Sequence, residues 1–215
     1  MAAFLSSKFL TLGYLTLVFF EWSRRIFWAR QFQTRNPAIK PLSGSIPNLP
    51  KVSVIIPARN EETNIARCVV HFFKQNYPAF EIIVVDDRSD DRTPHLLENL
   101  KKLSPVPFRI VRIEKLPAGW TGKNHAMAAG AKAADGEWLL FTDADTTHQT
   151  HSILSSVQKA VTEKIDFLTL APEVECISFW ENVVQPLAVS SLALWFNTTD
   201  LNQPNSRAVL ANGQF

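Results

Sequence analysis

The chain has few cysteines and lacks two glycine-rich nucleotide-binding motifs. Its 215 residues include only Cys68 and Cys176, which lie far apart and form no CxxC pair. Two isolated cysteines build neither a disulfide framework nor a zinc site, and they fit a reducing compartment. No GxxxxGK[ST] phosphate loop and no GxGxxG fingerprint occurs, which disfavours a P-loop nucleotidase and a dinucleotide-dependent dehydrogenase.

Positive charge is concentrated near the N-terminus. The formal net charge is +2, yet the first forty residues carry about +5 and the remainder about −3. A local basic patch beside an apolar run indicates an anionic membrane surface, whereas a nucleic-acid-binding domain carries basic residues along its folded face. We therefore expect the membrane, and no nucleic acid, as a partner.

The same N-terminal region predicts a transmembrane helix. Residues 9–22 are nearly all apolar, and extension toward the N-terminus gives roughly the 20 residues that a spanning helix needs. Trp22 and Arg24 begin the aromatic and cationic flank typical of a cytoplasmic interface. We expect residues 1–23 to form a single-pass anchor in the cell (inner) membrane, with the following domain on the cytoplasmic side. A cleaved signal peptide and a helix in the membrane plane are the alternatives.

An α/β domain is predicted from residue 51 to residue 215, after a basic, proline-rich linker over residues 24–50. Short β-branched runs alternate with segments of helical periodicity. The expected strands are residues 52–56, 81–85, 108–113, 138–142 and 166–170, and the expected helices are residues 61–74, 93–103, 123–134 and 150–163. Continuous apolar strands separated by helices predict a mostly parallel sheet with helices on both faces.

A second apolar stretch covers residues 177–196. It is rich in aromatic and aliphatic residues, but Glu181, Asn182 and Pro186 argue against a membrane span. We expect a buried or partly buried amphipathic helix, with contact to a membrane surface as the alternative. The sequence stops at Phe215 in what resembles the approach to another strand, so we expect it to be truncated at the C-terminus.

Polar and acidic residues follow three of the predicted strands. These segments are PARNEE at residues 57–62, DDRSDD at residues 86–91, and DAD at residues 143–145. In parallel α/β sheets ligands bind beyond the carboxyl ends of the strands, so these segments form the candidate site. Helix caps and solvated turns are the alternative, above all for residues 86–91.

The carboxylates of Asp143 and Asp145 are candidate metal ligands. Like charges two residues apart repel each other unless a cation or hydrogen bonds offset them. Mg²⁺ or Mn²⁺ prefers oxygen ligands and shares its coordination shell with phosphates, which suits a diphosphate leaving group. Because such hard cations do not favour imidazole, His148 and His151 are expected to be surface residues at the start of a helix.

Two further features carry open alternatives. The segment GWTGKNH at residues 119–125 combines glycines, Lys123 and a helix N-terminus, so it is either a phosphate-binding turn or an ordinary flexible one. Within it, Trp120 either stacks on a sugar or acceptor or packs against the protein. Cys68 lies on the apolar face of its predicted helix, where a core position is favoured over a nucleophile.

Three ordered segments carry a family resemblance. VSVIIPARNEETNI, EIIVVDDRSDDRT and GWTGKNHAMAAGAKAADGEWLLFTDADT, in this order and spacing, resemble the family 2 glycosyltransferases with the Rossmann-like GT-A fold. The resemblance covers residue 51 to about residue 170. The GWTGKNHA segment and the N-terminal apolar run look most like the membrane-bound group that acts on lipids such as hopanoids and carotenoids.

The resemblance implies a hexosyltransferase-like enzyme that moves a sugar from a nucleoside-diphosphate sugar, with UDP favoured, to a lipid or lipid-linked acceptor. It implies inversion in a single displacement, with Mn²⁺ or Mg²⁺ as cofactor. The implied site comprises the nucleotide-sugar-binding residues Pro57, Ala58, Arg59, Glu61, Asp87, Lys123 and Asp143, and the metal ligands Asp143 and Asp145. The general base is expected beyond Phe215. A non-catalytic, membrane-tethered nucleotide-sugar-binding module and a sugar nucleotidyltransferase are the alternatives.

Overall fold

The structure is a computed structural model that describes most of the central part of the chain and portions of both ends. The described residues are 11–24, 26–27, 39–40, 48–170, 175–185 and 188. The chain divides into two units, one made of Met1–Ala38 and Glu173–Leu210, the other of Ile39–Pro172 and Ala211–Phe215.

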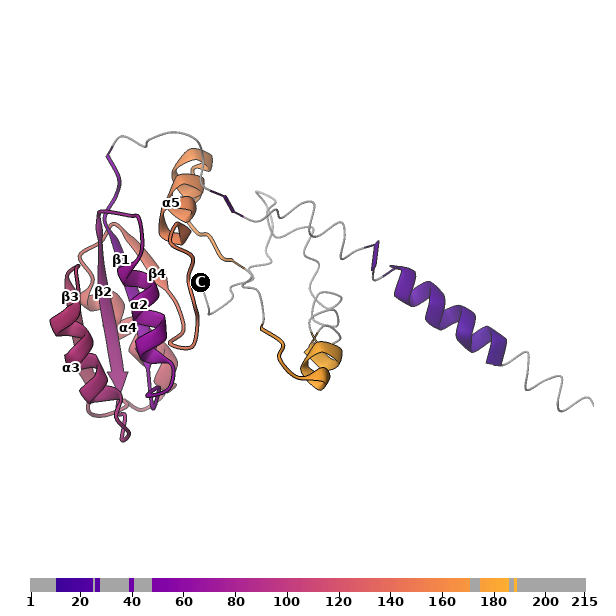
Figure 1. Cartoon of the computed structure of the whole chain (residues 1–215), viewed down its shortest axis with the longest axis horizontal. Helices are drawn as coiled ribbons and strands as arrows, with labels where there is room; N and C mark the ends of the chain where they lie inside the picture. The colour runs from indigo at the N-terminus through magenta and orange to yellow at the C-terminus, as the bar shows by residue number, and fades with distance from the viewer. Residues whose placement is uncertain are drawn as a thin grey trace, which may run out of the picture. The chain divides into compact units, whose positions relative to one another are not determined.

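A four-stranded sheet is the centre of the second unit (Figure 1). Its elements in chain order are β1 Val52–Ala58, α2 Ile65–Phe73, β2 Phe80–Asp87, α3 Thr93–Leu103, β3 Phe108–Ile113, α4 Gly122–Ala133, β4 Trp138–Phe141 and α5 Ser152–Glu163. The strand order is β3-β2-β1-β4, and every neighbouring pair is parallel. The predicted α/β class and parallel sheet are confirmed.

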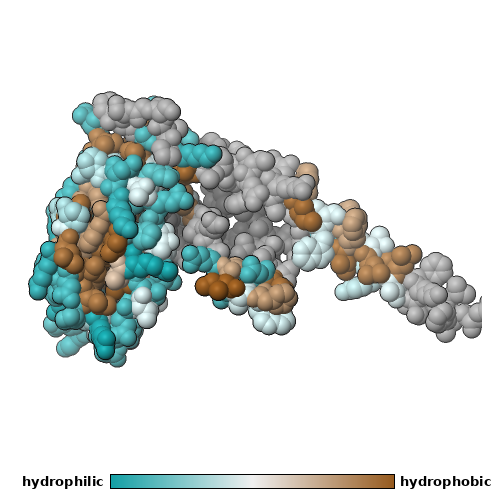
Figure 2. All heavy atoms as spheres, viewed as in Figure 1, coloured by the Kyte–Doolittle hydropathy of each residue, from teal (hydrophilic) through white to brown (hydrophobic). Residues whose placement is uncertain are grey.

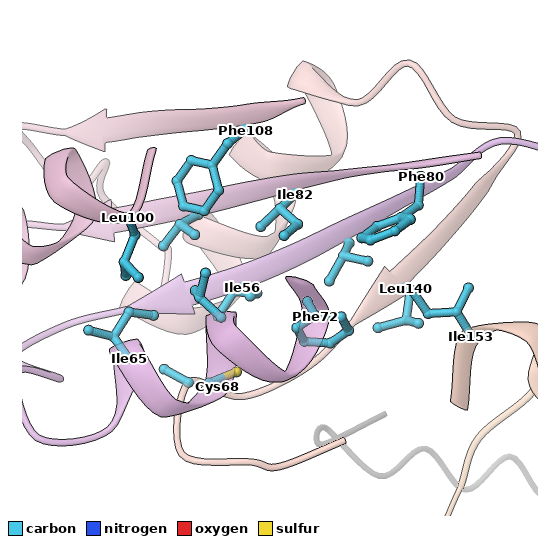
Figure 3. Packing of buried hydrophobic residues seen from close by; sticks show 14 of the residues in the cluster. Ile56, Ile65, Cys68, Phe72, Phe80, Ile82, Leu100, Phe108, Leu140 and Ile153 are labelled. Carbon is cyan, nitrogen blue, oxygen red and sulfur yellow. The ribbon is translucent and has the colours of Figure 1, made fainter. Parts of the chain in front are cut away.

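Both faces of the central strands β1 and β2 are buried, as their continuous apolar runs predict. Successive side chains of a strand point to opposite faces, so Val54 and Ile56 pack with α2, α3 and α5, whereas Ile55 packs with α4. Figure 3 shows Phe72 and Cys68 of α2 within the first of these clusters. The sheet is covered by helices on both sides, because neither face could be left in water without exposing a row of branched apolar side chains.

Helix α4 lies close to the sheet because its inner face includes the small residues Ala126 and Gly130. A Cβ atom at Gly130 would lie 2.4 Å from Cγ2 of Ile55, well inside the ordinary contact distance. Ala126 is fully buried against the same face. The alanine-rich composition of this segment therefore sets the distance between helix and sheet, and with it the position of the helix N-terminus.

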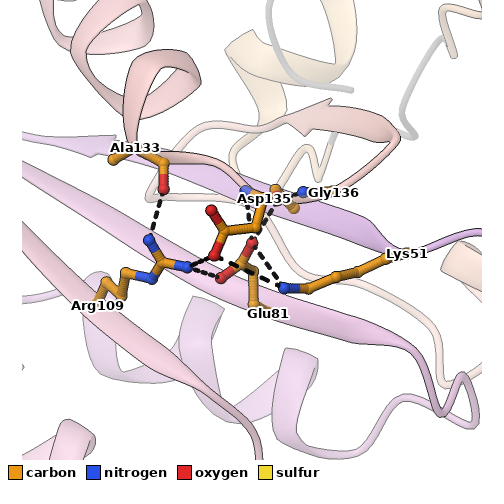
Figure 4. A network of polar contacts seen from close by, with 7 residues as sticks. Lys51, Glu81, Arg109, Ala133, Asp135 and Gly136 are labelled. Carbon is orange, nitrogen blue, oxygen red and sulfur yellow. Dashed lines mark hydrogen bonds and ion pairs between the residues drawn. The ribbon is translucent and has the colours of Figure 1, made fainter.

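A buried carboxylate ties together the amino ends of three strands (Figure 4). Glu81 of β2 is fully buried. It accepts hydrogen bonds from Ser53 Oγ at 2.7 Å and from the backbone of Asp135 at 3.0 Å, and it pairs with Arg109 Nη2 at 2.9 Å and with Lys51 Nζ at 3.4 Å. Burial alone would raise the pKa of Glu81, but these hydrogen bonds and positive charges hold it below its ordinary value.

The predicted fifth strand over residues 166–170 is wrong. These residues form no ladder with any strand in residues 48–170, and Phe167 is 60% exposed. The residues of this segment are typical of a strand. A strand also needs a neighbouring strand to pair with its backbone N–H and C=O groups. Helix α5 begins at Ser152 rather than at residue 150, and no side chain caps it.

The N-terminal apolar run is helical over residues 11–24, and its large side chains are exposed (Figure 2). None of the helices that the structure describes is both long and apolar enough to cross a bilayer. Residues 1–10 of the predicted transmembrane anchor lie outside the described residues, and those described do not support a spanning helix.

The second apolar stretch is helical over residues 179–185 and is started by a capping box. The backbone of Ser178 donates to Glu181 Oε2 at 2.8 Å, and the backbone of Glu181 donates to Ser178 Oγ at 3.2 Å. Phe179 and Trp180 are 72% and 69% exposed. A helix was predicted here, but its predicted burial is wrong for these side chains; residues 186–187 and 189–196 lie outside the described range.

Removal of the Glu81 charge tests the buried network. We expect Glu81→Gln to lower the free energy of unfolding at pH 7 by about 2 kcal/mol, because a neutral amide replaces the buried carboxylate that accepts hydrogen bonds from Ser53 and Arg109. Since the folded pKa of Glu81 is depressed, this contribution exists above the ordinary value of 4.5 and disappears as pH falls through the lower folded value. Urea unfolding at several pH values measures it.

The exposed pair Arg112–Glu98 is the matched control, because its side chains are 54% and 49% exposed. We expect Glu98→Gln to change the free energy of unfolding by at most about 1 kcal/mol. Equal losses in the two variants, or a Glu81→Gln effect that persists at acid pH, would contradict the role given to the network.

Candidate functional site

Three loops meet at one edge of the sheet, beyond the carboxyl ends of β2, β1 and β4. These strands are neighbours in that order. The chain runs from β1 outward through β2 to β3 and then returns to the other side of β1 as β4. The direction of winding therefore reverses between β1 and β4, which is the position where open α/β sheets bind ligands.

Hydrogen bonds in both directions join the loop after β1 to the loop after β2. The backbone of Asn60 donates to Ser89 Oγ at 3.0 Å, and the backbone of Asp90 donates to Asn60 Oδ1 at 2.9 Å. The backbone of Glu62 donates to Asp91 Oδ2 at 3.1 Å. Asn60 has a left-handed backbone (φ 56°), which asparagine tolerates better than most residues. The two loops therefore form one rigid edge.

Asp86, near the end of β2, and Asp91, in the loop after it, are turn and cap residues. Asp86 Oδ1 accepts from the backbone of Ser89 at 3.2 Å, and Asp91 Oδ1 accepts from the backbone of Thr93 at 2.9 Å, at the start of α3. The alternative of turns and caps is therefore confirmed for Asp86 and Asp91. It does not account for Asp87.

Asp87 is a buried carboxylate at the end of β2, and it is 4% exposed. Arg88 donates to its two oxygens at 2.8 and 3.2 Å. This hydrogen bond is the main reason that the pKa of Asp87 lies below its usual value; burial opposes it, and the charges of Arg88, Arg59 and His125 add to it. Asp87 is thus an ionised hydrogen-bond acceptor at the edge of the sheet.

The N-terminus of α4 lies between Asp87 and the DAD segment. A Cβ atom at Gly122 would lie 2.5 Å from Asp87 Oδ2, so a larger residue here would displace the Asp87 carboxylate. The next residue, Lys123, places its Nζ 2.6 Å from Asp143 Oδ1. The structure therefore brings together Asp87, Lys123 and Asp143, which are separated in sequence, around the first turn of one helix.

The two carboxylates of the DAD segment face away from the core. Ala144 between them is 3% exposed and packs inward, whereas the Asp143 side chain is 21% exposed and Asp145 is exposed. Among the described residues, no group of three or more His, Cys, Asp or Glu side chains could hold a metal ion. Two outward carboxylates fit Mg²⁺ or Mn²⁺, which takes one or two protein carboxylates and completes its shell with phosphates and water.

The other predicted nucleotide-binding residues occupy the end of β1 and the loop after it. Pro57 and Ala58 are the last residues of β1, and Ala58 is buried. Arg59 is exposed, and Glu61 accepts a hydrogen bond from Asn64 Nδ2 at 3.0 Å. They border the edge that carries Asp87, and their nucleotide contacts stay a prediction.

Trp120 precedes α4 and is 46% exposed. Its ring meets the ring of His125 edge to face, with 5.5 Å between the centroids. The contact with His125 therefore covers part of the indole, and the rest of it is accessible.

His148 is the residue whose position the sequence analysis missed. It was expected at the surface, but it is 8% exposed, and its ring packs on Phe72 with 4.4 Å between the centroids. Burial, reinforced by the charge of His71, lowers the pKa of His148 to about 4. The threonines in TDADTTH supply hydrogen-bond partners for the ring, but no local pattern in this segment predicts its burial.

Cys68 is fully buried in the core, as predicted. Burial is the main cause that raises the pKa of its thiol to about 12, and nearby negative charges, including Asp145 and Asp143, act in the same direction. A thiol of this kind is not a nucleophile near neutral pH.

Comparison with known proteins identifies the family. The family "Glycosyl transferase family 2" matches residues 53–208, so the chain belongs to glycosyl transferase family 2. Its parallel α/β sheet is of the GT-A type.

Curated relatives and a solved structure resemble parts of the chain. Beta-monoglucosyldiacylglycerol synthase of Trichormus variabilis is 28% identical over 180 residues, which are 82% of this chain and 37% of that protein. The 4,4'-diaponeurosporenoate glycosyltransferase of Staphylococcus haemolyticus is 32% identical over 49% of this chain and 27% of that protein. The mannosyltransferase PcManGT of Pyrobaculum calidifontis, in complex with GDP-Man and Mn²⁺, is 25% identical over 63% of this chain and 39% of its own, with a TM-score of 0.51. The chain thus spans about a third of the length of these relatives.

The pairing of Arg88 with Asp87 can be tested directly. We expect Arg88→Ala to raise the pKa of Asp87, because the hydrogen bond that stabilises the carboxylate is lost while the burial remains. The measurement is an NMR titration of the Asp87 carboxyl carbon. In Arg112→Ala, which removes an exposed arginine paired with Glu98, the titration should stay as in the wild type; an unchanged midpoint in Arg88→Ala would disprove the pairing.

Proposed function

We propose that this chain is the donor-binding part of a glycosyltransferase that moves a sugar from a nucleoside-diphosphate sugar, with UDP favoured, to a lipid or lipid-linked acceptor. The observation that carries the proposal is the meeting of Asp87, Lys123 and Asp143 at the N-terminus of α4. One edge of the sheet thus carries a hydrogen-bond acceptor for a base, a cation for a phosphate and a carboxylate for a metal ion. Membership of glycosyl transferase family 2 supports the reaction class.

The residues divide the recognition of the donor between them. Asp87 is ionised and accepts hydrogen bonds, so it suits the N–H donor of a uracil base. Lys123 is a mobile point charge suited to a phosphate, and the N–H groups that begin α4 favour an anion at the same place. Movement of Lys123 from Asp143 to a phosphate would leave the Asp143 carboxylate available to a cation.

Asp143 and Asp145 would hold Mn²⁺ or Mg²⁺. The bound cation would neutralise the negative charge that builds on the departing diphosphate. The complex of PcManGT with GDP-Man and Mn²⁺ supports this assignment by similarity. Inversion in a single displacement and a general base beyond Phe215 are parts of the same proposal.

The acceptor class rests on the named relatives. Beta-monoglucosyldiacylglycerol synthase and 4,4'-diaponeurosporenoate glycosyltransferase both have lipid-related names. A lipid or lipid-linked acceptor is therefore the acceptor that we propose for the whole protein.

Calorimetry with UDP tests the donor site. We expect the chain to bind UDP with Mn²⁺ and to lose this binding when a chelator removes the metal. Asp143→Asn and Asp145→Asn should each weaken it by more than about tenfold, because a change at the ligand itself costs more than a change in the outer shell. Asp166→Asn, an exposed aspartate after α5, removes the same charge and should bind as the wild type does.

Two results would reject the assignment. UDP binding that is unchanged when Mn²⁺ is removed would contradict the proposed metal site. So would wild-type affinity for UDP in both Asp143→Asn and Asp145→Asn. Release of pyrophosphate from a nucleoside triphosphate and a sugar phosphate would favour a nucleotidyltransferase, and binding without transfer by the whole protein would favour a binding module.

We also propose that the N-terminal segment attaches the chain to the cytoplasmic face of the cell membrane. Its basic residues and the exposed side chains of Phe19 and Phe20, 74% and 70% accessible, support the proposal. Flotation with vesicles that contain phosphatidylglycerol measures the attachment.

We expect the double variant Phe19→Ser, Phe20→Ser to weaken vesicle binding by about tenfold or more, because two large apolar side chains no longer enter the interface. Leu103→Ser, which removes an apolar side chain exposed on α3, is the control and should float as the wild type does. Wild-type protein that stays with the lipid-free fraction would reject the attachment.

A further inference from the structure

The loop that carries Asp143 and Asp145 contains a largely buried polar cluster that holds its backbone. The cluster consists of Thr142, Thr146 and His148, whose Oγ1, Oγ1 and Nε2 atoms form a triangle with sides of 2.9, 3.0 and 3.0 Å. None of these three residues was assigned a role in the donor site. Each lies within a few residues of the two carboxylates in the same loop.

The cluster acts on one backbone carbonyl, that of Asp143. Thr146 Oγ1 donates to it at 2.8 Å, the backbone of Thr146 approaches it at 3.5 Å, and Cys68 Sγ donates to it at 3.5 Å. This carbonyl belongs to the peptide group between Asp143 and Ala144. Its direction therefore fixes where the side chains on either side of that peptide leave the backbone.

Counting hydrogens assigns the proton on His148. The single hydroxyl hydrogen of Thr146 goes to the carbonyl of Asp143, so Thr146 Oγ1 can only accept from its other neighbours. A hydrogen on Nε2 satisfies the contact of 3.0 Å between Thr146 Oγ1 and His148 Nε2, and Thr142 Oγ1, also 3.0 Å from Nε2, can share it. The ring is neutral near pH 7, because burial lowers its pKa to about 4, so Nε2 is the protonated nitrogen.

Helix α2 in turn holds the imidazole. His71 Nδ1 donates to the backbone carbonyl of His148 at 2.8 Å, and Phe72 packs on its ring. Cys68 lies one turn earlier on the same helix, and positions i, i+3 and i+4 share one face. One face of α2 thus supports the loop at three points, from Cys68 through His71 to Phe72.

We propose that His148 is a positioning residue for the donor-site metal ligands: its Nε2–H holds Thr146, and Thr146 holds the peptide group that follows Asp143, in the short loop that carries both carboxylates. The inference rests on the proposed function, in which Asp143 and Asp145 bind the metal ion. It assigns His148 no contact with donor, acceptor or metal. Mutation of an outer-shell partner of this kind typically weakens metal affinity by about 10- to 100-fold.

The tautomer of His148 is the first test, and it needs no ligand. Long-range ¹H–¹⁵N correlation spectra of the ¹⁵N-labelled chain distinguish a protonated Nε2 from a protonated Nδ1, and the His148→Gln variant identifies the signals of this ring. We expect the Nε2–H form at pH 7. A protonated Nδ1 would overturn the proposal.

Binding of UDP with Mn²⁺ is the second test, in two matched pairs. His148→Phe keeps a ring against Phe72 but removes the donor, whereas His148→Gln keeps an N–H. Thr146→Val keeps the shape of the side chain but loses the hydroxyl, whereas Thr146→Ser keeps the hydroxyl. We expect the Phe and Val variants to weaken Mn²⁺-dependent binding by at least about tenfold, and the Gln and Ser variants to recover most of it.

A core variant separates positioning from general stability. Leu97→Ala removes a buried side chain of α3 and should lower the Tm while Mn²⁺-dependent binding stays that of the wild type. If Thr146→Val and His148→Phe bind Mn²⁺ and UDP as the wild type does, the positioning role is wrong and the donor site stands. If the wild type itself shows no Mn²⁺-dependent binding, the proposed function is wrong, and the positioning role falls with it.

Discussion

The arrangement of the site depends on the parallel pairing of β1 with β2 on one side and with β4 on the other. Parallel neighbours end at the same edge, so the residues that follow Ala58, Asp87 and Phe141 are forced together. A single antiparallel strand in this position would send one acidic loop to the opposite end of the sheet. The apolar residues of β1 and β2, buried on both faces, stabilise this pairing.

The opposite ends of the strands carry a different kind of chemistry. There, Glu81 is fully enclosed and satisfied by Ser53, Arg109 and Lys51. At the carboxyl edge, Asp143 is partly accessible and Asp145 is exposed. One end of the sheet thus uses a carboxylate to join strands, and the other leaves carboxylates available to a ligand.

Much of the fold was predictable because each element had a local cause. Continuous apolar runs predicted the four strands and their parallel arrangement, and helical periodicity predicted α2 to α5 within a few residues. The fifth strand over residues 166–170 failed because a strand depends on a neighbour that the local sequence does not specify. The predicted burial of Phe179 and Trp180 failed for a similar reason: an apolar face shows that a partner is favoured, but not which one.

From the sequence alone came the family, the sheet and the identity of the candidate acids, since motif order and apolar periodicity are properties of the chain itself. Only the tertiary structure decided that Gly122 touches Asp87, that Lys123 reaches Asp143, and that Asp86 and Asp91 serve turns and caps. It also placed His148 inside the protein, where its neighbours come from α2, more than seventy residues earlier. Contacts between distant segments depend on how helices pack on the sheet, and periodicity within one segment carries no information about that distance.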